Sequence, residues 1–358
     1  LQSGLSVGKV VVRVATRRTA GSDGGHAVTG GTGGLGLLTG RWLAQRGARR
    51  LVLASRSGAL ARGTAAEWDA VRASDAAASL ERCDTGEAAH VRRLVALAPL
   101  LAGVWHAAGV LADAMLPSQD ARSLAASYAP KAHGAWSLHS ACRTTGVCSF
   151  ALFSSVAALL GGAGQANYSA ANACLDALAA CRRARGSAAA SVQWGAWAEV
   201  GMAARGAASE RMAAMEAASG FGRIGLAQGL AALGSAVRHD APSVTGVVPI
   251  VWSRFLGGGA AVPAFLSAFA PTLKAAAAAS NGSVARAPGV TLGAVLGMVK
   301  RTAGGAVDAD APLMEAGVDS LGAVELRNQL QGASGGSSLP STLVFDHPTA
   351  RQLASLLQ

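Results

Sequence analysis

The segment TGGTGGLG, residues 29–36, decides the fold of this chain. It follows a short apolar stretch at residues 27–28 and precedes an amphipathic helical pattern that Gly47 ends. Its glycines satisfy the pattern G-x-G-x-x-G, in which missing side chains let backbone amides and a helix N-terminus approach a pyrophosphate closely. A glycine-rich chain also produces such strings by chance, so the position between a strand and a helix carries the prediction. The glycines of the pattern are Gly31, Gly33 and Gly36.

A second signal follows this loop at the end of the next apolar stretch. In proteins that bind NAD, an acidic residue at this place contacts the ribose hydroxyl. Here the chain has Ser55 and Arg56 instead. A guanidinium favours a 2′-phosphate through charge-assisted hydrogen bonds, so the sequence predicts NADPH rather than NADH. The alternative is a solvated arginine after a strand. The candidate cofactor contacts in the loop are Thr29, Gly30, Gly31, Thr32, Gly33, Gly34, Leu35 and Gly36.

Short apolar stretches alternate with helical patterns from residue 26 to about residue 252. This alternation is typical of a parallel sheet with crossover helices, so we expect an α/β fold with a doubly wound, Rossmann-type sheet. The expected strands are residues 27–28, 51–53, 104–105, 150–153, 192–194 and 247–251.

The composition of the 358 residues excludes several classes of protein. No apolar run is long enough to span a membrane, and the N-terminus has no signal-peptide pattern. The net charge is +11, but the arginines are scattered singly, so no nucleic-acid partner is expected. Five cysteines and seven histidines show no metal-binding spacing, so no metal is expected either. The irregular cysteines indicate reduced thiols and a cytoplasmic location, with an organelle as the alternative.

The chain contains only two tyrosines, and one of them lies in the stretch YSAAN, residues 168–172. Tyr168 and Asn172 share one helix face. A glycine-rich connection separates them from Ser155 at a strand end, which places a hydroxyl and a phenol at the ligand-binding edge of the sheet. A phenol needs a nearby cation to act as an acid–base group at neutral pH. Lys131, on the helical pattern before that strand, can supply the charge.

These residues, in this order, resemble the ketoreductase domain of modular polyketide synthases, a branch of the short-chain dehydrogenase/reductase superfamily. The resemblance covers roughly residues 22–256 and includes HAAGV at 106–110 and WGAWAEVGMA at 194–203. It implies a doubly wound fold and reduction of a 3-oxoacyl thioester by NADPH. It also implies cofactor contacts from Asp84, His106, Ala107, Ala108 and Gly109.

The resemblance further implies a catalytic tetrad. Tyr168 would protonate the developing alkoxide, and Ser155 would hydrogen-bond the ketone oxygen. Lys131 would hold the nicotinamide ribose and lower the pKa of the phenol, and Asn172 would support the proton relay. Other members of the superfamily have Lys where Asn172 stands, whereas the polyketide branch exchanges the two positions, as this chain does.

The resemblance also bears on stereochemistry. The L-D-D signature of B-type reductases has its counterpart in Leu111-Ala112-Asp113, and Leu160 stands where A-type reductases carry Trp. We therefore expect a B-type enzyme that forms a D-configured hydroxyl, with Asp113 and Trp194 at the substrate; the departure from the signature is Ala112. Near Asp84 the family usually has a clearer apolar strand, so the third strand is expected to be irregular.

A small helical module follows a linker rich in Ala and Gly at residues 257–286. Three helical patterns occur after it, one of them with Ala323, Leu326 and Leu330 on a single face, and they predict a small bundle. Ser320 at the start of that helix has the position of an ordinary cap. The longer string, residues 287–358, resembles an acyl carrier protein, which implies that Ser320 carries 4′-phosphopantetheine and a β-ketoacyl chain.

Residues 1–20 resemble the last strand of an enoylreductase domain, so we expect a fragment of a longer multienzyme. The predicted domains are that remnant, a ketoreductase at 21–256, the linker and the carrier. The partners implied are a carrier-tethered substrate, a phosphopantetheinyl transferase, and ketosynthase, acyltransferase, dehydratase and enoylreductase domains in a homodimeric synthase. Two alternatives stay open: the equivalent segment of an animal-type fatty acid synthase, and a redox-silent scaffold beside a working carrier.

Overall fold

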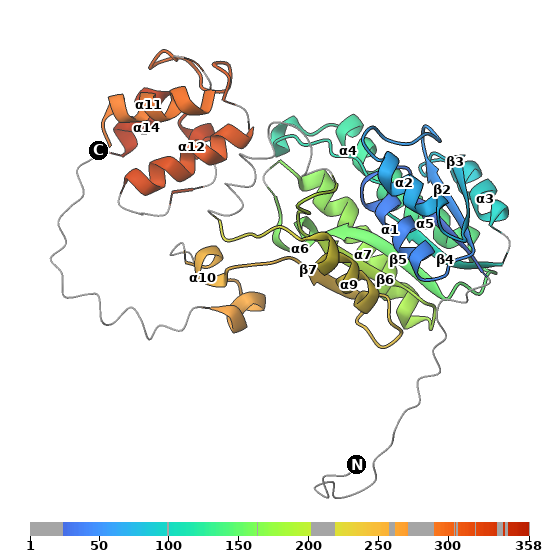
Figure 1. Cartoon of the computed structure of the whole chain (residues 1–358). Coiled ribbons are helices and arrows are strands. Elements are labelled where there is room, and N and C mark those ends of the chain that lie inside the picture. The colour runs from blue at the N-terminus through green and yellow to red at the C-terminus, as the bar shows by residue number, and fades with distance from the viewer. Residues whose placement is uncertain are drawn as a thin grey trace, which may run out of the picture.

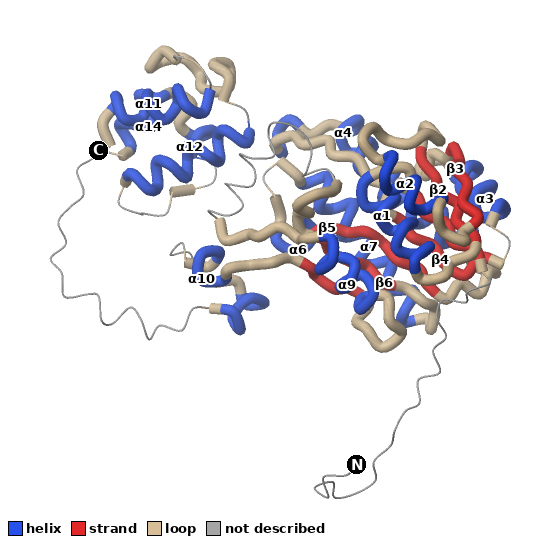
Figure 2. The backbone as a smooth tube through the Cα atoms, viewed as in Figure 1, coloured by secondary structure: helices blue, strands red, loops and turns tan. Residues whose placement is uncertain are grey.

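The computed structural model describes residues 24–98, 100–162, 164–201, 219–257, 262–270, 290–303, 305, 307–318, 320–334, 339–340 and 343–357. Its first part is a seven-stranded parallel sheet with the order β3-β2-β1-β4-β5-β6-β7 (Figures 1 and 2). The strands are β1 Gly25–Thr29, β2 Arg50–Ser55, β3 Ala77–Arg82, β4 Leu101–His106, β5 Ser149–Ser155, β6 Ala190–Trp194 and β7 Val244–Val247. The chain reverses its winding direction between β1 and β4, so their carboxyl ends border the crevice where such sheets bind ligands. The predicted fold class is confirmed.

Helices cover both faces of this sheet, as the crossover connections require. Leucine, valine and tryptophan side chains of alternate strand residues pack under α1 and α9 on one face, and the other set packs under α3, α5 and α7. The helices are α1 Gly34–Gln45, α2 Ala65–Arg72, α3 Ala88–Leu97, α4 Ala121–Tyr128, α5 Gly134–Ala141, α6 Ala157–Leu160, α7 Ala166–Ala184, α9 Leu226–Ala236 and α10 Trp252–Phe255. Three short elements are the 3-10 helices η1 Leu116–Ser118 and η3 Ala264–Phe269 and the π-helix η2 Ala129–His133.

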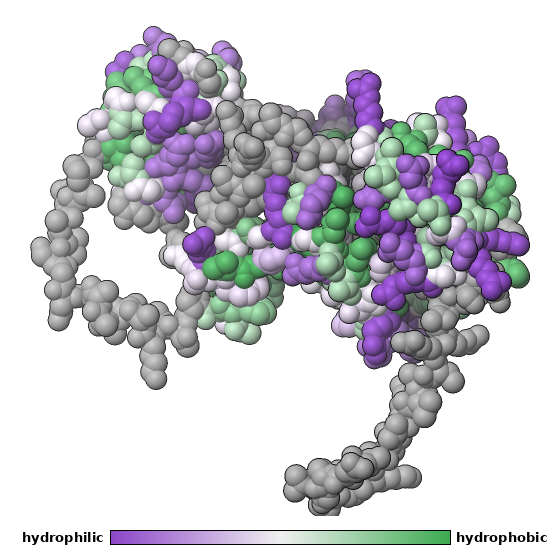
Figure 3. All heavy atoms as spheres, viewed as in Figure 1, coloured by the Kyte–Doolittle hydropathy of each residue, from purple (hydrophilic) through white to green (hydrophobic). Residues whose placement is uncertain are grey.

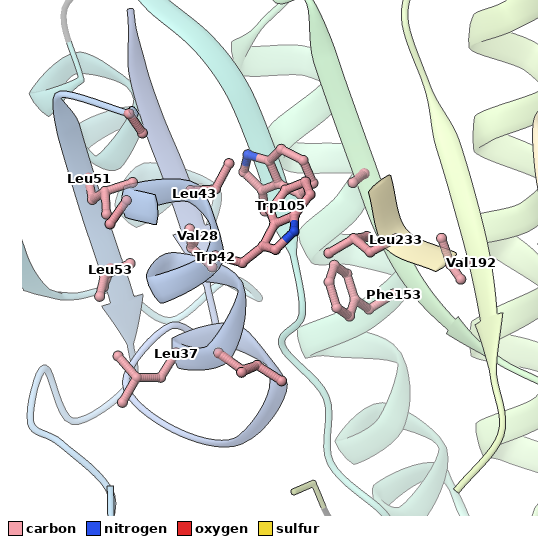
Figure 4. Close-up of a cluster of buried hydrophobic side chains, with 14 of the residues drawn as sticks. Val28, Leu37, Trp42, Leu43, Leu51, Leu53, Trp105, Phe153, Val192 and Leu233 are labelled. Atoms are coloured by element: carbon pink, nitrogen blue, oxygen red, sulfur yellow. The ribbon is translucent and has the colours of Figure 1, made fainter. Parts of the chain in front are cut away.

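Two tryptophans anchor the core under α1. Trp42 of α1 meets Trp105 of β4 edge-on, with ring centroids 5.6 Å apart, and leucines and valines from several strands surround the pair (Figure 4). Edge-to-face packing of this kind adds to the stabilisation that burial alone provides. The core therefore fixes α1, and with it the glycine loop, on the sheet.

Two expected strands differ from the observed ones. β3 is regular, and each of its six residues pairs with β2, so the prediction of an irregular third strand was wrong. As an edge strand it is only half buried, and its sequence is correspondingly less apolar. The last strand is Val244–Val247 rather than residues 247–251. Pro249 follows it closely, and a proline has no N–H for a ladder.

The C-terminal part is a separate helical bundle. It comprises α11 Leu292–Ala303, α12 Ser320–Ala333, α13 Leu343–Asp346 and α14 Ala350–Leu356 around its own apolar core. Ala323, Leu326 and Leu330 are buried in this core, as their spacing predicts. Thr349 and Gln352 form a reciprocal capping box at the start of α14, which satisfies backbone donors there.

No helix among the described residues is long and apolar enough to cross a membrane. The visible surface in Figure 3 mixes hydrophilic and hydrophobic residues over both parts. The expected domain boundaries stay predictions. Residues 1–20 lie outside the described residues, as does most of the expected linker. Its described part, η3, contacts α10 through stacked rings of Phe269 and Trp252 with centroids 4.1 Å apart.

Candidate active site

A cavity of about 870 Å³ lies at the carboxyl edge of the sheet, between the glycine loop, the segment after β4, β5 and the start of α7. It collects most of the residues that the sequence singles out. Those that line it are Gly30, Thr32, Gly33, Gly34, Leu35, Gly36, Ala107, Ala108, Gly109, Asp113, Lys131, Ser155, Tyr168 and Trp194.

The glycine loop leaves room that side chains would fill. Gly30 has φ +68°, and a Cβ there would lie 2.8 Å from the carbonyl of Ala107. A Cβ on Gly36 would collide with the carbonyl oxygen of Gly30. The helix α1 begins at this loop without a side-chain cap or an acidic residue in its first turn, so its N-terminal amides stay available to an anion. This cradle fits the diphosphate of a dinucleotide.

His106 connects the sheet to the backbone of Lys131. It is fully buried, with Nδ1 2.7 Å from Thr29 Oγ1 and Nε2 3.0 Å from the carbonyl oxygen of Lys131. Burial lowers its pKa to about 4, so the imidazole stays neutral at physiological pH. The ring therefore ties β1 and β4 to the backbone of η2. The contact that the resemblance implies between His106 and the cofactor stays a prediction, because the ring does not line the cavity.

Lys131 lies in the π-helix η2 and is 4% exposed. Its Nζ donates to the carbonyl oxygen of Phe153 at 2.9 Å and to Asn172 Oδ1 at 2.8 Å. Burial lowers the pKa of this ammonium group to about 7, and the carboxylate of Asp176 acts in the opposite direction. An ammonium has three N–H donors, so one is left for the cavity. Such a group exchanges protons readily near neutral pH.

Tyr168 and Asn172 lie one turn apart on α7, as the sequence predicts. Asn172 is fully buried and contacts both residues: its Nδ2 donates to the main-chain carbonyl oxygen of Tyr168 while its Oδ1 accepts from Lys131 Nζ. The Lys131 Nζ lies 5.1 Å from the centroid of the Tyr168 ring. Burial raises the pKa of Tyr168, and hydrogen bonding to the side chains of Asn172 and Ser155 opposes that rise. The site thus holds a protonated phenol beside an ammonium group.

Six of the predicted cofactor residues do not line the cavity: Thr29, Gly31, Ser55, Arg56, Asp84 and His106. Arg56 is exposed directly after β2, at the carboxyl edge of the sheet. Asp84 follows β3 and accepts the amide N–H of Gly86 at 3.0 Å, so it shapes its own turn. Their roles toward the cofactor stay predictions.

The cavity is also bordered by residues that the sequence reasoning missed. Gln165, just before α7, donates to Asp113 Oδ2 at 3.2 Å and so holds that exposed carboxylate at the cavity. Trp197 lies with Trp194 in the cavity wall, with ring centroids 5.0 Å apart. Its position three residues before Tyr168 was the sequence signal that could have placed Gln165 at the site.

The second expected site is Ser320. It is the first residue of α12, as the sequence predicts. Its role as the attachment point stays a prediction.

The comparisons with known proteins agree with this geometry. Residues 24–199 match the family described as "KR domain", and residues 292–357 match the family "Phosphopantetheine attachment site". Fold and site thus define a Rossmann-type ketoreductase domain with a carrier domain behind it. The chain belongs to the ketoreductase–carrier segments of polyketide synthases.

The chain spans only a small part of the length of the relatives that it matches. It is 40% identical to polyketide synthase GfsB of Streptomyces halstedii over 91% of its own length but 6% of the relative. It is also 40% identical to the spectinabilin polyketide synthase system protein NorB of Streptomyces orinoci, over 92% of this chain and 16% of that one. It is 36% identical to the mycoketide-CoA synthase of Mycobacterium tuberculosis, of which it spans 9%.

Solved structures give the same assignment. The ketoreductase from the first module of phoslactomycin biosynthesis in Streptomyces sp. HK803 superposes with a TM-score of 0.63 at 36% identity, covering 70% of this chain and 58% of that chain. An A-type ketoreductase from a modular polyketide synthase superposes with a TM-score of 0.61 at 36% identity, over 65% of this chain and 49% of that chain.

Gly109→Ala tests whether the position of Lys131 matters. A Cβ on Gly109 would lie 2.8 Å from Lys131 Cε, so the lysine side chain must shift from its observed position. We expect kcat for ketone reduction to fall roughly 10- to 100-fold, because small displacements of catalytic groups have effects of this size. The melting temperature should change little. Gly146→Ala, whose Cβ would meet nothing within 4 Å, is the matched control. Unchanged kcat in Gly109→Ala would contradict the prediction.

Proposed function

We propose that this segment reduces a carrier-bound 3-oxoacyl thioester to the 3-hydroxyacyl thioester with NADPH, as one step of polyketide biosynthesis. The observation that carries the proposal is the convergence of Lys131, Asn172 and Tyr168 beside the glycine cradle at one cavity. The glycine cradle fits a dinucleotide, and the Lys131 Nζ lies 5.1 Å from the ring centroid of Tyr168, a phenol whose pKa burial raises.

The reaction needs a hydride at the carbonyl carbon and a proton at the carbonyl oxygen. The nicotinamide, when bound, supplies the hydride. Tyr168 gives its phenolic proton to the oxygen as negative charge develops there. Ser155, which lines the same cavity, donates a second hydrogen bond to that oxygen and so lowers the barrier. Lys131 stabilises the phenolate that remains and returns a proton to it.

Cofactor choice and stereochemistry follow from residues at the two ends of the cavity. Arg56 has the position to pair with a 2′-phosphate, which supports NADPH over NADH. Asp113 stands at the substrate side, and Leu160 replaces the tryptophan of A-type enzymes. These residues support the B-type outcome, a D-configured hydroxyl.

The carrier domain supplies the substrate in this proposal. A phosphopantetheinyl transferase installs the arm on Ser320, and the thiol of the arm holds the β-ketoacyl chain. Tethering raises the effective concentration of the substrate at the reductase cavity, so weak docking suffices. The remaining synthase domains, from ketosynthase to enoylreductase, and the homodimeric assembly belong to the same proposal.

Tyr168→Phe removes the proposed acid and tests the function directly. We expect kcat to fall about 10²- to 10⁴-fold with a 3-oxoacyl thioester, because general acid catalysis contributes that much. The decay of NADPH fluorescence measures it. Tyr128→Phe is the matched control, since the chain contains just these two tyrosines. Equal rates in the two variants would refute the assignment of the acid.

Arg56→Gln tests the choice of cofactor. Loss of a charge-assisted pair with the 2′-phosphate should raise KM for NADPH about tenfold or more. KM for NADH should stay unchanged, because NADH has no 2′-phosphate. Steady-state kinetics with both cofactors measure the ratio. The exposed Arg72 at the end of α2 provides the control variant Arg72→Gln. A parallel change for both cofactors would argue against 2′-phosphate recognition.

Ser320→Ala tests the attachment site. Incubation with coenzyme A and a phosphopantetheinyl transferase should add one phosphopantetheine to the unaltered chain and none to Ser320→Ala, as seen in the intact mass. The Ser334→Ala chain, altered directly after the end of α12, should still accept the arm. Modification of the Ser320→Ala chain would place the arm on another residue.

A further inference from the structure

The ketoreductase domain contains an acidic side chain behind the cavity that the mechanism above does not use. Asp176 lies on α7 four residues after Asn172 and eight after Tyr168, so the three residues share one helix face. It is partly buried, whereas Asn172 and Tyr168 are buried.

Two buried side chains of β6 hold this carboxylate. Ser191 Oγ donates to Asp176 Oδ1 at 2.5 Å, and Gln193 Nε2 donates to Asp176 Oδ2 at 2.8 Å. Ser191 is 1% exposed and Gln193 is 7% exposed. Both oxygens thus accept hydrogen bonds from the neighbouring strand, which fixes the orientation of the carboxylate against the sheet.

Its hydrogen bonds alone do not balance the charge of Lys131. Both of its acceptors, the Phe153 carbonyl and Asn172 Oδ1, are neutral. Among the residues that the structure describes, the other titratable groups around it are His106 from β4, which is neutral, and Tyr168 from α7, whose pKa is raised. The carboxylate of Asp113, which lines the cavity, raises the pKa of Tyr168. Asp176 is the anion that acts on Lys131.

We propose that Asp176, held by Ser191 and Gln193, is a positioning residue that keeps the buried Lys131 protonated and so keeps the proton relay charged at neutral pH. The proposal rests on the proposed function only for its effect on turnover. The direction of the effect is set by electrostatics: a nearby anion favours the ammonium form and raises the pKa of Lys131, whereas burial lowers it. The two effects together give Lys131 a pKa of about 7.

The titration of Lys131 can be observed directly, because the chain has four lysines: Lys9, Lys131, Lys274 and Lys300. The full chain is labelled with 13C-lysine, and the εCH2 signals are followed by NMR between pH 5 and pH 11 without cofactor or substrate. The signal that disappears in Lys131→Met identifies the residue. We expect a midpoint near 7 in the unaltered chain.

Asp176→Asn keeps the shape of the side chain and removes its charge. We expect the Lys131 midpoint to fall by about one pH unit or more. Asp113→Asn removes a carboxylate from the same cavity and should leave that midpoint in place. Asp176→Glu, which restores the charge, should return it toward the original value. An unchanged midpoint in a folded Asp176→Asn chain, or equal shifts in the two Asn variants, overturns the proposal.

Folding of each variant is checked by circular dichroism and thermal melting. If Asp176→Asn does not fold, Ser191→Ala takes its place: it retains the charge but frees the carboxylate, and we expect a smaller downward shift. No shift in Ser191→Ala would then overturn the proposal. A role in packing α7 on β6 alone would lower the melting temperature without moving the Lys131 midpoint.

Turnover provides the second measurement. Reduction consumes a proton, so activity that depends on the Lys131 ammonium is lost as pH rises through its pKa. A lower pKa moves this loss to lower pH, and the falling limb of kcat against pH should shift down by the same amount as the NMR midpoint. Because the NMR titration contains no substrate, failure of the proposed reduction and failure of this inference give different results.

Discussion

Lys131 places an ammonium group, 4% exposed, between η2, β5 and α7, where a main-chain carbonyl and an amide oxygen accept two of its N–H groups. Removing a charge from water is costly unless hydrogen bonds and an opposite charge offset the loss. The cavity, the helix that carries Tyr168 and the strand that carries Ser155 are all arranged around this requirement. Asn172 accepts one of those N–H groups from α7 and at the same time donates to the main-chain carbonyl of Tyr168, so a single amide contacts both the lysine and the tyrosine.

The same arrangement explains why the sheet and the site cannot vary independently. Thr29 and His106 are partners in the register of β1 and β4, and this pairing places the imidazole so that its second nitrogen reaches the Lys131 carbonyl. A shift of register would move the ring away from Thr29 and release η2. Residues that look like a cofactor motif in the sequence therefore also support the backbone of the catalytic lysine.

Much of this could be predicted from the sequence, because the signals are local. The glycine loop needs glycines where backbone approaches backbone, and the apolar strands need apolar residues, so both leave a pattern in the chain. β3 left a weak pattern because an edge strand buries only part of its surface. The end of β7 depended on the proline two residues beyond it. The hydrogen bonds that hold Asp176 could not be predicted from a local sequence pattern, because Ser191 and Gln193 reach it only through the packing of α7 on β6.

The π-helix shows how the fold produces a position that no regular helix offers. η2 joins α4 to α5, and such widened turns are frequent at functional sites because they redirect side chains and free carbonyls. Two of those carbonyls are used here: Pro130 O accepts from Thr85 Oγ1 at 3.1 Å, and Lys131 O accepts from His106 Nε2 at 3.0 Å. Thr85 follows β3 and His106 ends β4, so the carboxyl edge of the sheet holds the widened turn from two strands. The depth at which the lysine is buried is thus set by the sheet, and its pKa follows from that depth.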